Sequence, residues 1–373
     1  MEKTLILAHD LGTTGNKATL YDAEGTMLAS SFSGYPTEYP APGWAEQDPE
    51  QWWTAVKAST RGLLQQVSGA GERIAGISFS GHMMSCCPVD REGRALRKAI
   101  IWSDQRAYRE KDALARVFGD EDAYRRTGTV WVANYLAAKA LWLKEHEPEV
   151  FRAARCYLMP KDFVAHRLTG RMVTDYSDAS GTNLFDIQAK RWCEDIAGEI
   201  GLDLSTLPPA LPSTSTVGGL SSRAAGELGL AGGLPVIIGG GDGPCATAGA
   251  GARGPEDCYN SYGTSSWNAV ATERPLYDAR RRIFILCHLD PERYMAAGTM
   301  QFAGGSFEWL NSWLGTTEGM LARDLGLSSY DLLSLEAERA EPAAGGVLFL
   351  PYLLGERSPY WDPEVKGAFL GLT

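Results

Sequence analysis

The stretch Leu7-Ala8-His9-Asp10-Leu11-Gly12-Thr13-Thr14-Gly15-Asn16-Lys17 joins two apolar, strand-like runs through a turn that is rich in glycine and hydroxyl groups. Residues 4–8 form a β-prone run before the turn, and residues 17–21 form another after it. Glycines allow the backbone to approach an anion closely, and successive N–H groups in such a turn can form an anion-binding concavity. We therefore interpret this hairpin as a candidate phosphate-binding element.

Two threonines and two charged residues give this turn its candidate ligand groups. Thr13 and Thr14 offer hydroxyl donors, Lys17 could supply a cation to a phosphate, and Asp10 could hold a hydrated magnesium ion. An ordinary hairpin, in which Asp10 forms an Asx-turn, explains this stretch by itself equally well. The role of the turn therefore depends on the rest of the chain.

Length and charge restrict the class of protein. The chain has 373 residues, which is enough for two or three domains. Its net charge of −11, with scattered Lys and Arg, argues against a nucleic-acid-binding surface. No apolar run approaches the roughly 20 residues of a membrane helix, and the N-terminus lacks a signal-peptide pattern. We therefore expect neither a nucleic-acid partner nor membrane association.

The cysteines indicate the redox compartment. Seven are present, an odd number, and none forms a C-x-x-C motif. This usage suits reduced thiols in the cytoplasm rather than a disulfide framework or a zinc site. It also predicts that the adjacent Cys86 and Cys87 are core thiols.

Several helices and strands are predicted from periodicity and from end signals. The tetrapeptide Asp48-Pro49-Glu50-Gln51 has the form of a helix start, with a capping box closed by its glutamine. Apolar residues at helical spacing follow as far as Val67, and they place Trp52 and Trp53 in the core. Helices are also predicted over residues 112–146, 161–168, 245–252 and within 300–313, strands over 27–32, 74–80, 234–238 and 267–271, a strand followed by polar residues over 100–106, and surface loops over 174–183 and 207–219.

The strand at 74–80 delivers Gly81-His82-Met83-Met84-Ser85 to the edge of a sheet. In open α/β sheets that edge is where ligands bind. A lone histidine there is nevertheless more often structural than functional. In the strand-like segment at 100–106, Asp104 and Arg106 are close enough in sequence to pair with each other.

A second candidate site is Gly239-Gly240-Gly241-Asp242-Gly243-Pro244, which follows the strand at 234–238. Asp242 at a strand end could accept a proton from a substrate hydroxyl. The alternative is that Asp242 only caps the following helix. Gly241, Gly243 and Ala246 also satisfy the dinucleotide fingerprint G-x-G-x-x-A, although no acidic residue on a second strand follows at the usual spacing.

A third stretch, Gly263-Thr264-Ser265-Ser266, repeats the chemistry of the first turn in the second half of the chain. It is followed by the predicted strand at 267–271. Two such turns, one in each half, suggest two related sheets that face one nucleotide.

Taken in order, these motifs resemble those of the FGGY carbohydrate kinases, and within that family they are most similar to xylulokinase-like enzymes. The resemblance runs from Asp10 to Thr373, and its specificity comes from the order and spacing of the motifs. The matching motifs are Asp10-Leu11-Gly12-Thr13-Thr14, Ile101-Trp102-Ser103-Asp104-Gln105-Arg106, Pro160-Lys161-Asp162-Phe163, Leu168-Thr169-Gly170, Gly240-Gly241-Asp242-Gly243, Tyr262-Gly263-Thr264-Ser265 and Gly355-Glu356-Arg357-Ser358-Pro359.

The resemblance implies an α/β, actin-like and ribonuclease-H-like fold, with two domains that flank a deep cleft. We expect a sugar-binding domain over residues 1–252 and an ATP-binding domain over residues 253–373. Family members continue further with a glycine-rich motif that contacts adenine, so the second domain is expected to be incomplete at Thr373. We accordingly expect weak ATP binding and poor turnover from this chain.

The implied reaction is magnesium-dependent transfer of the ATP γ-phosphoryl group to a sugar or polyol, with a ketopentose as the expected substrate. A homodimer is one assembly that the resemblance allows. The matching positions make Asp242 the catalytic base and Asp10 the carboxylate near magnesium, and they place Thr13, Thr14, Lys17, Gly263, Thr264, Ser265 and Gly304 at ATP and its phosphates. The candidate substrate contacts are His82, Met83, Asn134, Asp242 and Gly243.

Two departures from the xylulokinase pattern bear on substrate choice. Xylulokinases typically carry Gly-Gln-Met-His-Gly where this chain has residues 81–85, so Met84 replaces the histidine and His82 replaces the glutamine. The residue after the base, commonly an asparagine, is Gly243 here. Because the pocket loses polar groups, the identity of the sugar does not carry over.

Two other functions are compatible with parts of the sequence. One is an NAD-linked polyol oxidoreductase that uses the glycines around Asp242. The other is a non-catalytic actin-like module, or a fragment, that binds sugar without turning it over. Release of ADP in the presence of sugars would separate the kinase from both.

Overall fold

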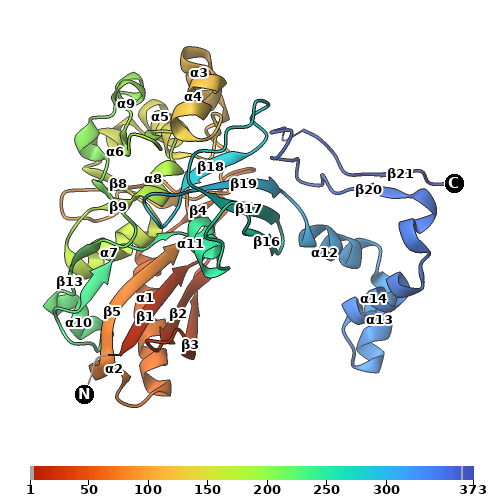
Figure 1. Cartoon of the computed structure of the whole chain (residues 1–373), viewed down its shortest axis with the longest axis horizontal. Helices are drawn as coiled ribbons and strands as arrows, with labels where there is room; N and C mark the ends of the chain where they lie inside the picture. The colour runs from red at the N-terminus through yellow and green to blue at the C-terminus, as the bar shows by residue number, and fades with distance from the viewer. Residues whose placement is uncertain (1–3, 363) are drawn as a thin grey trace. The chain divides into compact units, whose positions relative to one another are not determined.

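The computed structural model describes residues 4–362 and 364–373, and it divides into two compact units (Figure 1). The first unit contains the residues up to 255 together with 271–277 and 285–295. The second contains residues 256–270, 278–284 and 296–373. The chain therefore passes between the two units several times.

A seven-stranded sheet is the centre of the first unit. Its order is β13-β14-β5-β1-β2-β3, and β15 pairs separately with β5. β1, β2 and β3 form an antiparallel meander, as predicted, whereas β5 runs parallel to β1 and to β14. The strands are β1 (Leu5–Leu11), β2 (Gly15–Tyr21), β3 (Met27–Gly34), β5 (Ile74–Gly81), β13 (Thr216–Gly219), β14 (Pro235–Ile237) and β15 (Gly240–Gly241).

Alternation along β1 decides which side chains reach the core. Leu5, Leu7, His9 and Leu11 are buried, whereas Asp10 is exposed. Successive side chains of a strand point to opposite faces. Asp10 therefore points away from the core, whereas its neighbour His9 points into it. The alternation thus leaves Asp10 on the solvent-accessible face of β1.

Three helices pack together on the sheet. They are α1 (Pro49–Gln66), α7 (Pro160–Thr169) and α10 (Ser222–Leu228), and α1 packs against β2 and β3 while α7 packs against β5, β13 and β14. The Asp48 side chain accepts the N–H of Glu50 at the start of α1, and Trp52 and Trp53 are buried, which confirms the predicted N-cap and core but not the capping box with Gln51. The main apolar core lies between these helices and the sheet.

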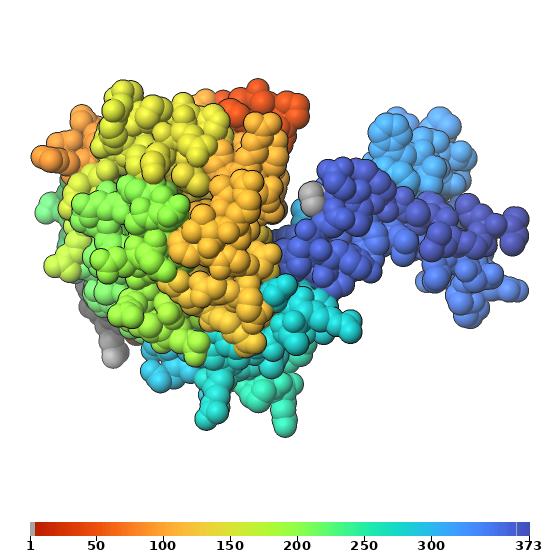
Figure 2. Space-filling model, turned by 90° about the horizontal axis from the view of Figure 1, so that it is seen from above, coloured from red at the N-terminus to blue at the C-terminus, as the bar shows by residue number. Residues whose placement is uncertain are grey.

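A second layer of helices lies beyond one end of the sheet, at the top of Figure 1. It has an apolar core of its own, and its orange-to-green surface is continuous in Figure 2. The helices are α3 (Tyr108–Phe118), α4 (Asp120–Thr127), α5 (Leu136–His146), α6 (Pro148–Ala153) and α9 (Glu194–Ile200).

The prediction of helix throughout residues 112–146 is wrong in this layer. Gly119 and Gly128 have positive φ values of 75° and 80°, and they separate α3, α4 and α5. A Cβ atom at Gly128 would lie 2.1 Å from the carbonyl oxygen of Ile285. The glycine therefore permits both a left-handed backbone and a close backbone approach, which a helix through this position would prevent.

The predicted loop at 174–183 is also wrong, because this segment is buried and largely regular. It contains β9 (Thr174–Asp175) and α8 (Tyr176–Ser180), and the Asp175 side chain caps the helix. The segment at 207–219 is likewise not entirely loop, since it contains β12 (Ala210–Leu211), which pairs with β9, and β13. The strand predicted at the start of the segment 100–106 is short: it is β7 (Ala99–Ile100), which pairs with β4 (Glu46–Gln47).

A second sheet has four strands in the order β16-β17-β19-β18. Its strands are β16 (Cys258–Tyr262), β17 (Ser266–Thr272), β18 (Phe284–Cys287) and β19 (Tyr294–Met300). The residues of this sheet are divided between the two units, and the second unit holds α12 (Gly304–Trp313), α13 (Thr316–Leu325), α14 (Ser329–Arg339) and the paired strands β20 (Leu348–Leu350) and β21 (Ala368–Leu370). The remaining elements are α2 (Ala70–Arg73), β6 (Cys87–Val89), β8 (Cys156–Leu158), β10 (Phe185–Asp186), β11 (Arg191–Trp192), α11 (Asp242–Gly249) and the 3₁₀ turns Leu204–Thr206 and Pro342–Gly346.

All seven cysteines are free thiols, and Cys86 and Cys87 are buried, as predicted. Among the described helices, none combines the length and the apolar character that crossing a bilayer requires.

Candidate functional site

The turn between β1 and β2 is held by side chains that bind its carbonyl groups. The Gly12 N–H donates to the Gly15 carbonyl (3.0 Å), which closes the turn. The Tyr35 hydroxyl donates to the Gly12 carbonyl (2.5 Å), and Gln47 Nε2 donates to the Thr13 carbonyl (2.7 Å). The carbonyl oxygens of the turn are therefore occupied by the protein.

The donors of the same turn remain available. Among residues 4–362 and 364–373, no protein acceptor pairs with the backbone N–H of Thr13 or Thr14. Thr14 is exposed, and the Thr13 hydroxyl accepts the indole N–H of Trp102 at 2.9 Å. A turn with bonded carbonyls and free N–H groups has the polarity that an anion requires.

Asp10 and Lys17 face each other across the β1–β2 ladder beside this turn. They are register partners, and both are exposed, while Ser80 of β5 is the partner of Asp10 on its other side. Desolvation raises the pKa of Asp10, and the Ser80 hydrogen bond and the charge of Lys17 oppose that shift. The carboxylate of Asp10 and the ammonium group of Lys17 thus lie on the two strands that flank the hydroxyl-rich turn.

Asp242 is the first residue of α11, and Gly241 occupies the N-cap position. Asp242 Oδ1 accepts the N–H of the next residue, Gly243, at 2.8 Å. The alternative in which Asp242 serves as the helix N-cap is therefore wrong. The Asp242 side chain is reached by solvent, although protein atoms lie close around it. Desolvation by these atoms, and in addition the negative charge of Asp10, raises the pKa of Asp242 to about 6.

The end of β5 lies next to this turn. A Cβ atom at Gly241 would lie 2.5 Å from the Met83 sulfur, so Met83 packs tightly beneath the residue that precedes Asp242. His82 is 1% exposed, it contacts Trp52 edge-on, and burial lowers its pKa to about 3. Both predicted substrate contacts therefore have buried side chains. The half-buried residue at this strand end is Met84.

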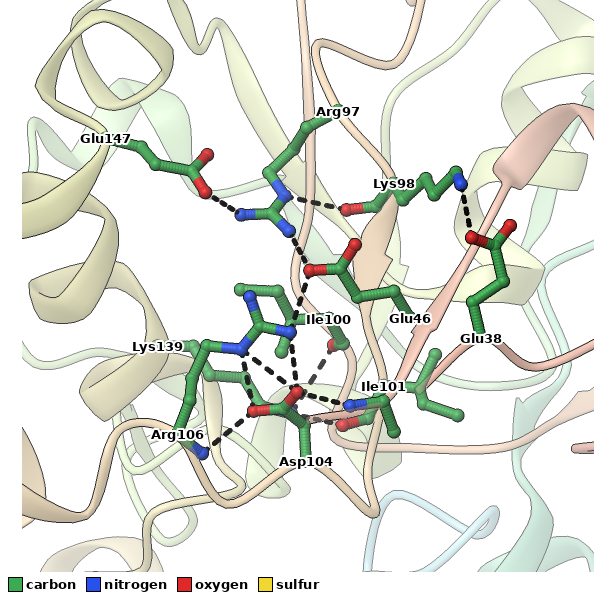
Figure 3. Close-up of polar contacts among 11 residues, drawn as sticks. Glu38, Glu46, Arg97, Lys98, Ile100, Ile101, Asp104, Arg106, Lys139 and Glu147 are labelled. Carbon is green, nitrogen blue, oxygen red and sulfur yellow. Dashed lines mark hydrogen bonds and ion pairs between the residues drawn. The ribbon is translucent and has the colours of Figure 1, made fainter. Parts of the chain in front are cut away.

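Met84 has a left-handed backbone (φ 62°) that a buried lysine holds in place. Lys139 Nζ donates to the carbonyl of Met84 (2.7 Å) and to that of Ile101 (2.8 Å). Figure 3 shows the lysine reaching the backbone of the 100–101 segment. Asn134 is half-buried and donates to the carbonyl of Trp102 (3.1 Å), so the predicted sugar contact Asn134 lies at this same cluster.

A buried ion-pair network fixes the segment that carries Trp102 (Figure 3). Arg106 pairs with Asp104 at 2.7 Å, as predicted, and also with Glu46 at 2.7 Å. Glu46 in turn binds Arg97, which also binds Glu147. Because Trp102 donates to Thr13, this network anchors one wall of the turn.

The second glycine- and hydroxyl-rich turn lies in the second unit, against the start of α12. The carbonyl of Gly263 accepts the N–H of Gly304 (2.9 Å), and the carbonyl of Thr264 accepts the N–H groups of Ala303 (2.8 Å) and Gly305 (3.0 Å). A Cβ atom at Gly304 would lie 2.5 Å from the Gly263 oxygen. The structure therefore brings together Gly304 and the predicted turn at 263–265, and only glycine fits at position 304.

Sequence reasoning missed two residues that organise the site. Trp102 was noted only as part of a motif, yet its indole binds the Thr13 hydroxyl. Lys161 is fully buried among three carboxylates. A lysine that begins a predicted helix gives no local signal of such burial, since two of its three partners, Asp175 and Asp178, come from the segment at 174–183.

Comparisons with known proteins agree over the whole length of the chain. Residues 5–249 match the N-terminal domain, and residues 258–373 the C-terminal domain, of the FGGY family of carbohydrate kinases. A xylulose kinase from Lactococcus lactis is 32% identical over 370 residues, which cover 99% of this chain and 72% of that protein. A gluconokinase from Bacillus subtilis is 30% identical over 368 residues, which cover 99% of this chain and 71% of that protein.

A crystal structure of ligand-bound xylulose kinase from Lactobacillus acidophilus superposes with a TM-score of 0.90 at 29% identity, covering 99% of this chain and 72% of that one. The fold is thus that of the two-domain, actin-like α/β sugar kinases. The chain belongs to the FGGY family of carbohydrate kinases, which are phosphotransferases that act on a sugar hydroxyl with ATP as the donor. This assignment overturns the NAD-linked interpretation of Gly241, Gly243 and Ala246.

Proposed function

We propose that this kinase phosphorylates a ketopentose, such as xylulose or a close relative, with Asp242 as the general base. Support comes from the relatives that are named xylulose kinase and from the position of Asp242 at the first turn of α11. The observation that carries the proposal is the neighbourhood of Asp242: an exposed carboxylate with a raised pKa, in electrostatic contact with Asp10. A carboxylate in such a setting can accept a hydroxyl proton near neutral pH.

We assign the phosphates of ATP to the two turns. In the first unit the N–H groups of Thr13 and Thr14 and the ammonium group of Lys17 are the proposed donors. In the second unit the proposed contacts are Gly263, Thr264, Ser265 and Gly304. Phosphoryl transfer depends mainly on alignment and on neutralising charge, and backbone and hydroxyl donors of this kind provide both.

Asp10 is the proposed magnesium carboxylate. Its chemistry fits, because Mg²⁺ prefers oxygen ligands and the negative charge of Asp10 raises the pKa of the nearby Asp242, an effect that a cation would oppose. When bound, the ion would neutralise negative charge on the transferred phosphoryl group. Asp10 and the turn beside it would hold it near the nucleotide.

The proposed sugar site uses the end of β5 and its neighbours. Because the side chains of His82 and Met83 are buried, we propose that they contribute through the backbone and through packing. Met84 and Asn134 supply the half-buried side chains, and Gly243 leaves space beside the base. The free cysteines suit a reducing compartment, for which we propose the cytoplasm. We place the domain boundary near residues 252–253, between the two family matches.

A coupled assay of ADP release tests this proposal. With Mg-ATP, we expect sugar-dependent release across a panel of pentuloses, hexuloses, polyols and aldonates. Because Met84 stands where xylulokinases carry a histidine, at least one acceptor other than D-xylulose should be phosphorylated with a comparable kcat/KM. A strong preference for D-xylulose over every other compound would contradict the inference from Met84. Absence of ADP release with all of them would contradict the proposed function.

The pKa of Asp242 predicts the pH dependence of catalysis. A general base must be unprotonated, so log(kcat/KM) for the sugar should fall with a slope of one below about pH 6 and level off above it. ATP also titrates, so the residual activity of Asp242→Asn serves as the control and should lack this limb. A flat profile from pH 5 to 8 in the wild type would count against Asp242 as the base.

A further inference from the structure

A buried charge cluster lies behind the Asp242 turn, and no step of the proposed reaction uses it. Lys161 Nζ lies 2.6 Å from Asp162, 2.8 Å from Asp175 and 3.0 Å from Asp178, and the four side chains are at most 1% exposed. Burying one cation with three carboxylates is costly unless their remaining hydrogen bonds are satisfied. Removing a hydrogen bond to one of these buried carboxylates is therefore expected to be costly.

Two serine hydroxyls satisfy the same oxygen of this cluster. Asp175 Oδ2 accepts the hydroxyl of Ser177 at 2.5 Å and the hydroxyl of Ser213 at 2.6 Å. Both serines are buried, and Asp175 Oδ1 pairs with Lys161. The two hydroxyls thus have the same acceptor and almost the same donor distance.

Only one of the two hydroxyls continues toward the base, since Ser213 contacts the Gly239 N–H (3.0 Å) through its backbone carbonyl, which an alanine keeps. The Ser177 hydroxyl accepts the backbone N–H of Gly241 at 2.9 Å, and Gly241 is the N-cap of α11 and the residue before Asp242. The packing around this bond is close, because a Cβ atom at Gly240 would lie 2.9 Å from the Ser177 hydroxyl and 2.2 Å from Leu289 Cδ2. A continuous chain of contacts therefore runs from Lys161 through Asp175 and Ser177 to the backbone of the base turn.

We propose that Ser177 is a positioning residue for Asp242. The Ser177 hydroxyl binds both the Gly241 N–H and Asp175, so the buried Lys161–Asp175 pair holds the Gly241 N–H in place. The proposal rests on the proposed role of Asp242 as the base. Without this bond the Gly241 N–H loses its side-chain acceptor and β15 is held only by its pairing with β5, so the carboxylate can move relative to the substrate hydroxyl. A displacement of about 1 Å can lower the rate about 100-fold even when binding persists.

The test compares Ser177→Ala with Ser213→Ala. Both remove a buried hydroxyl from Asp175 Oδ2, but only Ser177→Ala breaks the link to Gly241. We expect both variants to lose similar amounts of thermal stability. For Ser177→Ala, kcat per sugar-binding site, counted by calorimetry, should fall about 10-fold or more while KM for the sugar changes less than about threefold. For Ser213→Ala, kcat should stay within about twofold of the wild type.

A double-mutant cycle separates positioning from general loss of structure. If Ser177 acts through the carboxylate, adding Ser177→Ala to Asp242→Asn should change the residual kcat by less than about twofold. A full additional loss in that background, or an equal loss in Ser213→Ala, would overturn the positioning role. Unchanged kcat in Ser177→Ala would do the same. Near-wild-type turnover of Asp242→Asn alone would instead overturn the proposed base, and the role of Ser177 with it.

Discussion

Asp242→Asn is expected to lower kcat at least about 100-fold while the fold and the affinity for sugar persist. The asparagine carbonyl can still accept the N–H of Gly243, so the start of α11 keeps its local hydrogen bond. What disappears is the basic oxygen that takes the substrate proton. The measurements are steady-state ADP release and calorimetric titration with the sugar.

Asp22→Asn is a matched control for this substitution. Asp22 lies in the exposed turn between β2 and β3, where its Oδ1 accepts the N–H groups of Glu24 and Thr26. Both substitutions therefore replace a carboxylate with an amide at a side chain of the first unit that accepts a backbone N–H. Asp22→Asn should turn over like the wild type, and if Asp242→Asn does so as well, another group must be the base.

Several helices and strands of the first unit could be predicted because short-range sequence patterns determine them. The meander of β1, β2 and β3 follows from alternation and turn residues, and α1 follows from its cap at Asp48 and its apolar spacing. The two glycine- and hydroxyl-rich turns were likewise visible in the sequence, although the first is equally compatible with an ordinary hairpin. The family resemblance assigns Gly304 and the turn at 263–265 separately to the nucleotide, and the direct contact between them is visible only in the structure.

The errors fall where distant parts of the chain decide the outcome. The segment at 174–183 reads as a polar loop, yet its aspartates are buried because Lys161, from a separate helix, pairs with them. Residues 112–146 have helical periodicity, but Gly128 must pass close to the backbone of Ile285. His82 follows a strand and looks like a ligand-binding group, whereas Trp52 of α1 covers its ring. In each case the partner is remote in sequence and leaves no periodic signal.

Lys161→Met is expected to destabilise the first unit by about 3–5 kcal/mol at neutral pH, because it leaves buried carboxylates without their cation. Burial alone would lower the pKa of Lys161, but its carboxylate partners raise it well above the ordinary value. One lysine cannot neutralise three carboxylates. Burial raises the pKa of Asp178 well above its usual range; the charge of Lys161 opposes this shift, and the charges of Asp162 and Asp175 add to it. Urea unfolding at pH 7 measures the loss.

The pH dependence of this loss distinguishes missing charge from missing packing. Without the lysine, the buried carboxylates hold protons more tightly in the folded than in the unfolded state, so stability decreases as pH rises above the unfolded pKa of about 4. The deficit relative to the wild type should therefore shrink between pH 8 and pH 5. Lys57→Met is the control, because Lys57 pairs with Glu227 at the surface (3.3 Å), where such a pair contributes about 0–1 kcal/mol. A deficit for Lys161→Met that matches the control, or that is the same at both pH values, would show that the cluster does not depend on its cation.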